Sequence, residues 1–261
     1  MAIASLQNPL VKQIRKLHQA KQRHQQQLCL LEGTHLLQEA CRADRSLVTV
    51  CCTSDWRAAH CELWEQLCQR SQRAELVSPE VLKSMATTVQ PDGAIATLQR
   101  QANEAQFCPP VDLALGLETI QDPGNLGTIV RSAAAAGASG LWLSADSVDF
   151  DHPKVLRASA GQWFRLSMST RDDLSALVRQ CQAAGMQAVA TVPTAKQTFW
   201  QIDLRSPTLI LLGNEGAGLS PELVALANER VTIPLQPGVE SLNVAIAAAL
   251  ILYEARRQRG F

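Results

Sequence analysis

The chain has 261 residues, of which 46% are hydrophobic and 18% charged, a composition that suits one large or two ordinary globular domains and excludes a disordered chain. Because 24 Lys and Arg balance 24 Asp and Glu, the sequence also excludes a strongly basic protein that coats nucleic acid, and any RNA contact must be local. No apolar run approaches the roughly 18 residues of a membrane span, and residues 1–10 lack the layout of a signal peptide. We therefore expect a cytoplasmic protein without a membrane partner.

The first half begins with a predicted amphipathic helix. Its apolar residues recur at intervals of one helical face: Leu6, Leu10, Ile14 and Leu17. No acidic residue precedes Glu32, so the cations of this segment are unopposed: Lys12, Arg15, Lys16, Lys21 and Arg23. A phosphate backbone is a natural partner for such a face. The alternative is a solvated surface that binds nothing.

Both halves of the chain predict α/β structure. In the first half, short apolar segments alternate with helical ones at residues 28–31, 36–40, 47–51, 56–69 and 94–98. In the second half, strands are expected at residues 113–117, 140–143, 187–191, 209–212 and 231–233, and helices at 126–136, 174–184 and 242–257. Continuous apolar strands such as 209–212 indicate a parallel sheet covered on both faces. The helix at 242–257 is apolar nearly all round, so we expect it to be buried in the domain or against another subunit.

A polar stretch followed by Pro109 and Pro110 predicts a domain boundary, which divides the chain into residues 1–106 and 107–261. Seven of the eight cysteines lie in the first 108 residues, without a Cys-x-x-Cys pair and without grouped histidines. We therefore interpret them as reduced, buried thiols and predict no metal site.

Three clusters in the second half follow predicted strands, where parallel sheets bind their ligands. The first is Asp122-Pro123-Gly124-Asn125-Leu126-Gly127, followed by Arg131 and Gly137. Asp122 or Gly124 could begin a helix, and the permanent charge of Arg131 suits a phosphate clamp.

The second cluster is the glycine-rich loop Gly213-Asn214-Glu215-Gly216-Ala217-Gly218. It is neither the dinucleotide fingerprint nor a P-loop, and Glu215 suggests a ligand with hydroxyl, amine or cationic groups, although a plain turn remains an alternative. The third cluster is Ile233-Pro234-Leu235 with Ser241-Leu242-Asn243, in which Ser241 could cap the last helix.

Together these clusters resemble the three ordered motifs of the SpoU-type RNA ribose 2'-O-methyltransferases of the SPOUT superfamily. The resemblance covers about residues 112–257 and includes a segment at 157–161, Arg-Ala-Ser-Ala-Gly. More loosely, residues 8–12 and 31–35 resemble the substrate-binding domain of members that act on ribosomal RNA.

The resemblance implies a parallel-sheet α/β domain with a trefoil knot, where an unaided interpretation would have been Rossmann-like. It also implies a homodimer and S-adenosylmethionine bound by loop backbone at Gly213, Gly216, Ile233 and Leu242. It makes Arg131 the central catalytic residue, supported by Asn125, Glu215, Ser241 and Asn243.

Because a guanidinium is a poor base, we expect Arg131 to grip an RNA phosphate and orient the hydroxyl rather than to remove its proton. The separate first domain points to large-subunit ribosomal RNA as substrate. The alternatives are a transfer RNA substrate, a catalytically silent RNA-binding relative, and a nucleotide-cofactor enzyme of the Rossmann type, which would need a different glycine-rich turn.

Overall fold

The structure is a computed structural model that describes residues 2–100, 109 and 111–260. Its contacts divide the chain into two compact units. Unit 1 comprises Met1–Gln101 and Asp149–Phe164, and unit 2 comprises Ala102–Val148 and Arg165–Phe261. The boundary predicted between residues 106 and 107 lies outside the described residues. The segment 149–164, which sequence analysis assigned to the second domain, packs with the first.

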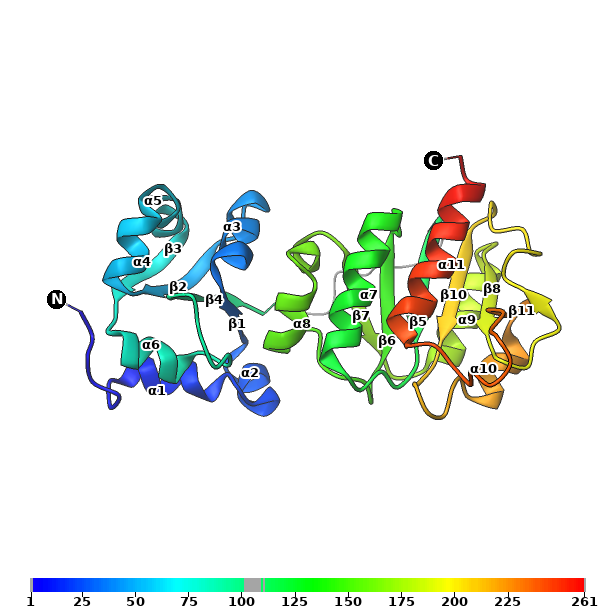
Figure 1. Ribbon diagram of the computed structural model, residues 1–261, viewed down its shortest axis with the longest axis horizontal. Helices are drawn as coiled ribbons and strands as arrows, with labels where there is room; N and C mark the ends of the chain where they lie inside the picture. Colours follow the sequence, from blue (N-terminus) through cyan, green and yellow to red (C-terminus); the bar gives the residue numbers. More distant parts are fainter. Residues whose placement is uncertain (1, 101–108, 110, 261) are drawn as a thin grey trace. The chain divides into compact units, whose positions relative to one another are not determined.

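Unit 1 is a four-stranded sheet with helices packed against it (Figure 1). The strands are β1 (Leu28–Glu32), β2 (Leu47–Cys52), β3 (Ser71–Leu76) and β4 (Ala94–Gln99), in the order β1-β4-β2-β3. The helices are α1 (Pro9–Lys16), α2 (Ala20–Gln26), α3 (Thr34–Arg42), α4 (Ser54–Ala59), α5 (Cys61–Arg70), α6 (Pro79–Met85) and α8 (Pro153–Ala158), followed by the 3-10 turn η1 (Gln162–Phe164). The α/β structure expected for this half is confirmed.

The ends of these elements follow from local chemistry. Helix α1 begins where the Asn8 side chain accepts a hydrogen bond from the Leu10 amide and Pro9 occupies the first turn. Its buried face, with Ile14, joins a core with β1 and α6. The predicted amphipathic helix is wrong in its extent. Leu6 lies before α1, and Lys21 and Arg23 belong to a second helix, α2, which begins at Ala20.

The structure of unit 1 differs from the sequence-based prediction at two further places. The helical pattern over residues 56–69 is interrupted at His60, which lies outside both α4 and α5. Strand β3 was not expected, because its sequence is polar and mostly exposed at the edge of the sheet.

Unit 2 contains a seven-stranded sheet in the order β7-β6-β5-β10-β8-β11-β9, in which all neighbouring strands run parallel within the described residues. The strands are β5 (Leu113–Leu117), β6 (Gly140–Ser144), β7 (Ser167–Arg171), β8 (Gln187–Thr191), β9 (Gln197–Thr198), β10 (Thr208–Leu212) and β11 (Glu229–Thr232). The predicted parallel sheet is therefore confirmed. The two strands not expected, β7 and β9, lie at its edges, where a polar sequence is tolerated.

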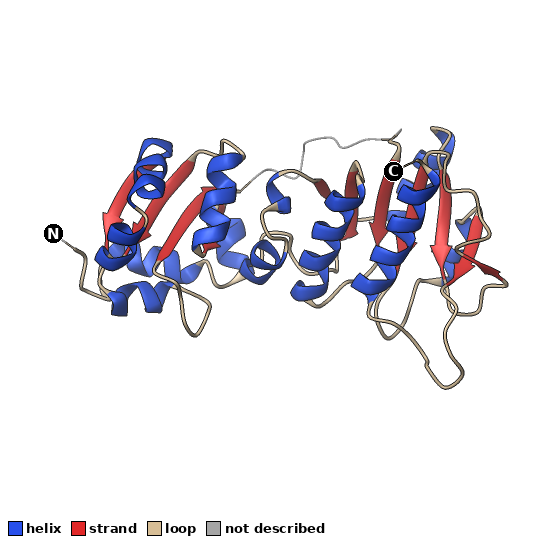
Figure 2. Cartoon of the chain, turned by 45° about the horizontal axis from the view of Figure 1, so that its top comes forward, coloured by secondary structure: helices blue, strands red, loops and turns tan. Residues whose placement is uncertain are grey.

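Helices cover both faces of this sheet (Figures 1 and 2). They are α7 (Pro123–Ala136), α9 (Leu174–Ala183), α10 (Pro221–Leu226) and α11 (Val244–Gln258). In Figure 1, α7 and α11 lie in front of the sheet and α9 and α10 behind it. Within the described residues, no helix combines the length and apolar character that crossing a bilayer requires.

Helix α11 buries only part of its apolar surface. Val244, Ala248 and Ile251 pack inside unit 2. An opposite stripe of the helix remains exposed in the single chain: Ile246 (51%), Leu250 (41%) and Tyr253 (52%). Leu242 (36%), on the loop just before the helix, is exposed as well. Within the single chain the helix is therefore buried on one side only, and the expected burial of its other side against another subunit stays a prediction.

The described cysteines are free thiols, and five of them are buried: Cys29, Cys41, Cys51, Cys52 and Cys181. Burial raises the pKa of both Cys51 and Cys52 to about 12, so these thiols stay protonated at neutral pH. They contribute to the core as small apolar side chains.

Candidate active site

The first loop of the site connects β5 to α7. The Asp122 side chain accepts a hydrogen bond from the Gly124 amide and caps α7, with Pro123 in the first turn. The cap is the predicted Asp122 rather than Gly124. It places Asn125 in the first turn of the helix, at the carboxyl edge of the sheet.

The second loop, residues 213–218, follows β10 and is closed by the Asn214 side chain. Its Oδ1 accepts hydrogen bonds from the amides of Gly216 (2.8 Å) and Ala217 (3.1 Å), and its Nδ2 donates to the Thr119 carbonyl (2.9 Å). Asn214 therefore shapes the glycine-rich loop and attaches it to the loop after β5. Sequence analysis missed this role, although an Asn next to glycines is a common turn signal.

Gly213 serves the loop itself. A Cβ at this position would collide with the backbone of Gly218 and Leu219. Glycine is therefore required at this position because the loop's own chain passes so close to it.

Three of the predicted site residues meet at the carboxyl edge of the sheet. The Asn125 Nδ2 donates to Glu215 Oε1 (2.5 Å), and the Asn243 Nδ2 donates to Asn125 Oδ1 (2.9 Å). One residue comes from each of the three clusters, although they are up to 118 positions apart. Glu215 and Asn243 are exposed, and the Glu215 carboxylate suits recognition of hydroxyl groups.

Asn243 also holds the last helix in place. Its Oδ1 accepts from the amides of Ala245 (2.9 Å) and Ile246 (3.4 Å), so Asn243 is the N-cap of α11. The prediction that Ser241 caps this helix is wrong, because the helix begins two residues later. Ser241 is exposed on the preceding loop.

Arg131 lies on the exposed surface of α7, two turns beyond Asn125. Within residues 2–100, 109 and 111–260, its guanidinium has no hydrogen bond or ion pair. An uncompensated cation on this helix is available to an anionic ligand. The structure does not join Arg131 to the Asn125–Glu215–Asn243 cluster through a hydrogen bond.

The predicted cofactor residues border the same edge. Gly216 and Leu242 are exposed, Gly213 and Ile233 are half-buried, and Leu235 adds an exposed apolar side chain. Glycine backbone and apolar side chains beside polar acceptors fit S-adenosylmethionine, which carries an adenine ring and charged groups. When bound, this cofactor supplies an electrophilic methyl group.

A second feature that sequence analysis missed is Glu118, directly after β5. Its Oε2 accepts a hydrogen bond from the Ser220 amide (2.7 Å), which ties the loop after β5 to the start of α10. The cavity beside it measures about 440 Å³ and is lined by Glu118, Thr119, Asn214 and residues 217–221. No motif marks this carboxylate in the sequence.

The fold and the site define a class of protein: a parallel α/β transferase that carries a polar cluster and backbone loops at the carboxyl edge of its sheet. Residues 112–253 match the SpoU rRNA Methylase family, and residues 8–96 match the MRM3-like substrate binding domain. The chain belongs to the SpoU family and is an S-adenosylmethionine-dependent RNA 2'-O-methyltransferase.

Similar proteins span nearly the whole chain. An uncharacterized tRNA/rRNA methyltransferase of Synechocystis is 49% identical and covers 99% of this chain and 94% of its own. The 23S rRNA (guanosine(2553)-2'-O)-methyltransferase RlmP of Bacillus subtilis is 29% identical and covers 97% and 98%. The AdoMet-bound rRNA methyltransferase of Sinorhizobium meliloti is 30% identical, with a TM-score of 0.87 over 98% and 97% of the two chains. The predicted family, enzyme class and cofactor are confirmed.

Proposed function

We propose that this methyltransferase acts on large-subunit ribosomal RNA. The observation that carries the proposal is that one chain contains both a separate unit that matches a substrate-binding domain and the Asn125–Glu215–Asn243 cluster. Similarity to enzymes named for 23S rRNA supports it, over 97% of the chain for one relative and 75% for another. A transfer RNA substrate is the second candidate, favoured only by relatives such as the tRNA (guanosine(18)-2'-O)-methyltransferase of Escherichia coli, which matches 57% of the chain.

Transfer of a methyl group to a ribose 2'-hydroxyl needs the hydroxyl to be held in line and relieved of its proton. In our proposal Arg131 binds the neighbouring phosphate, since no residue in the described part of the chain pairs with its charge, and thereby orients the ribose. Asn125, Glu215 and Asn243 hold the nucleotide through their hydrogen-bonding groups, together with Ser241. The proton passes to phosphate or water.

The proposed cofactor contacts are the backbone around Gly213 and Gly216 and the residues Ile233 and Leu242, within the trefoil knot that the family resemblance implies. The proposed active form is a homodimer joined through the exposed stripe of α11. An exposed apolar row at helical spacing is costly unless a partner covers it. The cytoplasmic location stays a prediction.

Ribose-methylation mapping of total RNA from cells with and without the protein tests the substrate. We expect one 2'-O-methyl group on large-subunit rRNA to disappear in the deletion and to return with the wild-type gene. Loss of a methyl group from transfer RNA instead would replace the proposal with the second candidate. Complementation with an Arg131→Ala gene is the matched control for catalysis.

A further inference from the structure

The segment 149–164 has an unusual position. It runs between β6 and β7 of the methyltransferase sheet and lies within the matched residues 112–253, yet its contacts assign it to unit 1. The chain consequently crosses between the units three times: near residue 101, at 148–149 and at 164–165. The last two crossings flank this segment, which contains α8 and η1.

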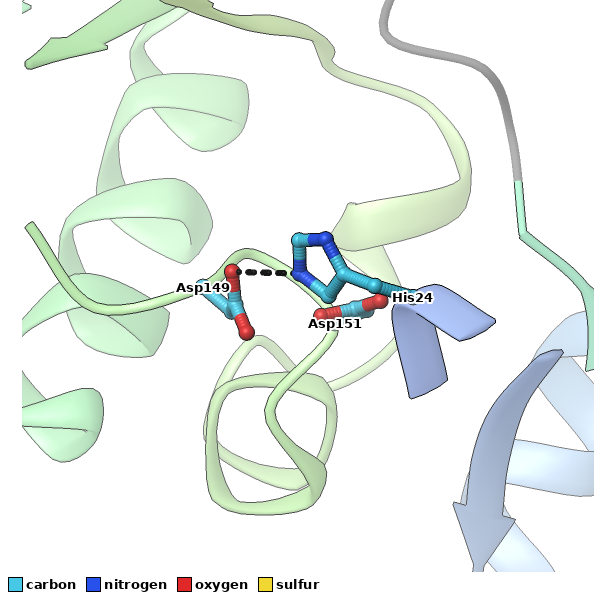
Figure 3. Close-up of side chains that lie close together, drawn as sticks. All are labelled: His24, Asp149 and Asp151. Atoms are coloured by element: carbon cyan, nitrogen blue, oxygen red, sulfur yellow. Dashed lines mark hydrogen bonds and ion pairs between the residues drawn. The ribbon is translucent and has the colours of Figure 1, made fainter. Parts of the chain in front are cut away.

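The beginning of the segment is anchored by a buried ionic network. Arg23, only 1% exposed, donates from Nη2 to Asp149 (3.0 Å) and from Nε to Asp151 (3.3 Å). Arg100 pairs with the second oxygen of Asp151. His24 contacts Asp149 at 3.1 Å, as Figure 3 shows.

This cluster of His24 and two aspartates has the spacing of a metal site. Each carboxylate oxygen already faces a cation or an imidazole, and two arginines balance the two aspartates. A metal ion would have to displace both guanidinium groups. The network therefore joins two chain segments rather than binding an ion.

The helix of the segment is anchored by a second network. The Glu32 carboxylate, 3% exposed at the end of β1, accepts hydrogen bonds from the amides and hydroxyls of Thr87 and Thr88. Arg157 on α8 donates to Glu32 (2.9 Å) and to the Thr87 hydroxyl (2.7 Å). Burial by itself raises the pKa of Glu32, but the hydrogen bonds from Thr87 and Thr88, with the Arg157 charge, outweigh it and leave that pKa below its ordinary value.

Close packing completes the attachment. Gly161 adopts φ +83°, and a Cβ there would collide with the Glu39 side chain on α3. The Phe164 carbonyl, at the end of the segment, accepts a hydrogen bond from Arg45 (2.7 Å). Both ends and the middle of the segment are thus fixed to the first hundred residues.

We propose that the segment 149–164 is a coupling element, in which Asp151 and Arg157 are positioning residues that link the RNA-binding unit to the methyltransferase sheet. The step that concerns RNA rests on the proposed function. Only four residues separate the segment from the end of β6 and two separate it from the start of β7, so the attachment of α8 to unit 1 acts on two strands of the catalytic sheet through short covalent connections.

Hydrogen exchange on the full chain tests the attachment without activity. Ile95→Val in β4 and Ile210→Val in β10 are matched changes at fully buried positions of units 1 and 2. We expect Ile95→Val to speed exchange of the α8 amides about threefold or more, in parallel with β1, and Ile210→Val to leave them unchanged. If α8 follows β10 instead, the coupling element does not exist.

Single-turnover methyl transfer tests the positioning role, with large-subunit rRNA from cells lacking the protein at saturating RNA and cofactor. Arg157→Gln and Asp151→Asn should lower the rate at least about tenfold, with RNA and cofactor Kd within about threefold of wild type. Arg157→Lys should recover part of the rate. Glu75→Gln, which breaks the exposed Arg73–Glu75 pair of β3, is the control and should leave the rate unchanged.

The outcomes separate the two proposals. A wild-type enzyme that methylates no ribosomal RNA overturns the proposed function, while hydrogen exchange still decides the attachment of α8. An active wild type with unchanged rates in both variants overturns the positioning role. If the variants only bound RNA more weakly, with an unchanged rate at saturating RNA, the segment would be part of the RNA site. That result would also overturn the positioning role.

Discussion

Single residues in this protein have roles that their neighbours in space decide. Arg23 belongs in sequence to the basic face predicted to bind phosphate, but it is buried against Asp149 and Asp151. The prediction that it joins that face is wrong. Lys12, Arg15 and Lys16 remain exposed on and beside α1 and keep the expected basic character.

Arg131→Ala should retain S-adenosylmethionine, because the cofactor loops are elsewhere, and should lose methyl transfer by at least ~10²-fold. Arg131→Lys should keep weak activity, since lysine retains the charge and lacks the planar fork. The measurement is single-turnover transfer of labelled methyl at saturating cofactor. Arg205→Ala, an exposed arginine paired with Asp203, is the control. Near-normal transfer by Arg131→Ala would remove Arg131 from the mechanism.

The two loop glycines should respond differently to alanine. Gly213→Ala forces the loop backbone apart, so we expect a lower Tm together with at least a tenfold weaker cofactor affinity, about 1.4 kcal/mol. Gly216→Ala meets only the Asn214 side chain, at 3.5 Å, and should weaken cofactor binding while Tm is unchanged. Calorimetric titration and thermal unfolding measure both. An unchanged affinity in Gly213→Ala would show that the loop does not bind the cofactor.

Among the elements, α11 combines two surfaces. Its buried residues pack inside unit 2 beside α7, while Ile246, Leu250 and Tyr253 form the exposed stripe. The spacing of four and three positions keeps these side chains on one face of the helix. The sequence predicted apolar contacts on all sides of this helix. The fold shows which side packs inside unit 2 and which side is exposed in the single chain.

Ile246→Glu combined with Leu250→Glu should convert the proposed dimer into a monomer, because two charges would have to be buried at the interface. Sedimentation analysis measures the oligomeric state. Val89→Glu, at an apolar residue of unit 1 that is 83% exposed, is the matched control and should stay dimeric. A wild-type chain that is already monomeric at micromolar concentration would contradict the prediction.

At the scale of the whole molecule, we expect RNA binding and methyl transfer to belong to different units. The two units are not two consecutive stretches of the chain. Segment 149–164 completes unit 1 from within the methyltransferase sequence. Removing the first unit therefore takes away Arg23 and Arg100, which pair with Asp151, and Glu32, which pairs with Arg157 on α8. We expect each such loss of a buried ion pair to cost several kcal/mol.

Deletion of residues 1–105 should accordingly lower Tm, weaken RNA binding and flatten its salt dependence, because fewer counterions are released. Cofactor affinity should survive, since every proposed cofactor residue belongs to unit 2. A milder comparison is the triple variant Lys12→Ala, Arg15→Ala, Lys16→Ala, which should reduce the salt slope while Tm stays unchanged. If the deletion protein and the triple variant both bound RNA with the affinity and salt slope of the wild type, the proposed division of labour between the units would be contradicted.

The sequence by itself determined the α/β class, the parallel sheet and the three clusters of the site, because strand hydrophobicity and glycine-rich loops are local signals. It also determined that Asn125, Glu215 and Asn243 belong to one site, through the order of the motifs. Tertiary structure decided the rest. Only folding buries Arg23, makes Gly213 necessary to its own loop, makes Asn243 rather than Ser241 the cap of α11 and assigns residues 149–164 to unit 1. The burial of Arg23 and the placement of residues 149–164 depend on contacts between residues as many as 128 positions apart, and no local pattern of apolar residues encodes such contacts. The roles of Gly213 and Asn243 depend on contacts within six positions, but the exact backbone path of a loop decides them, and composition does not encode that path.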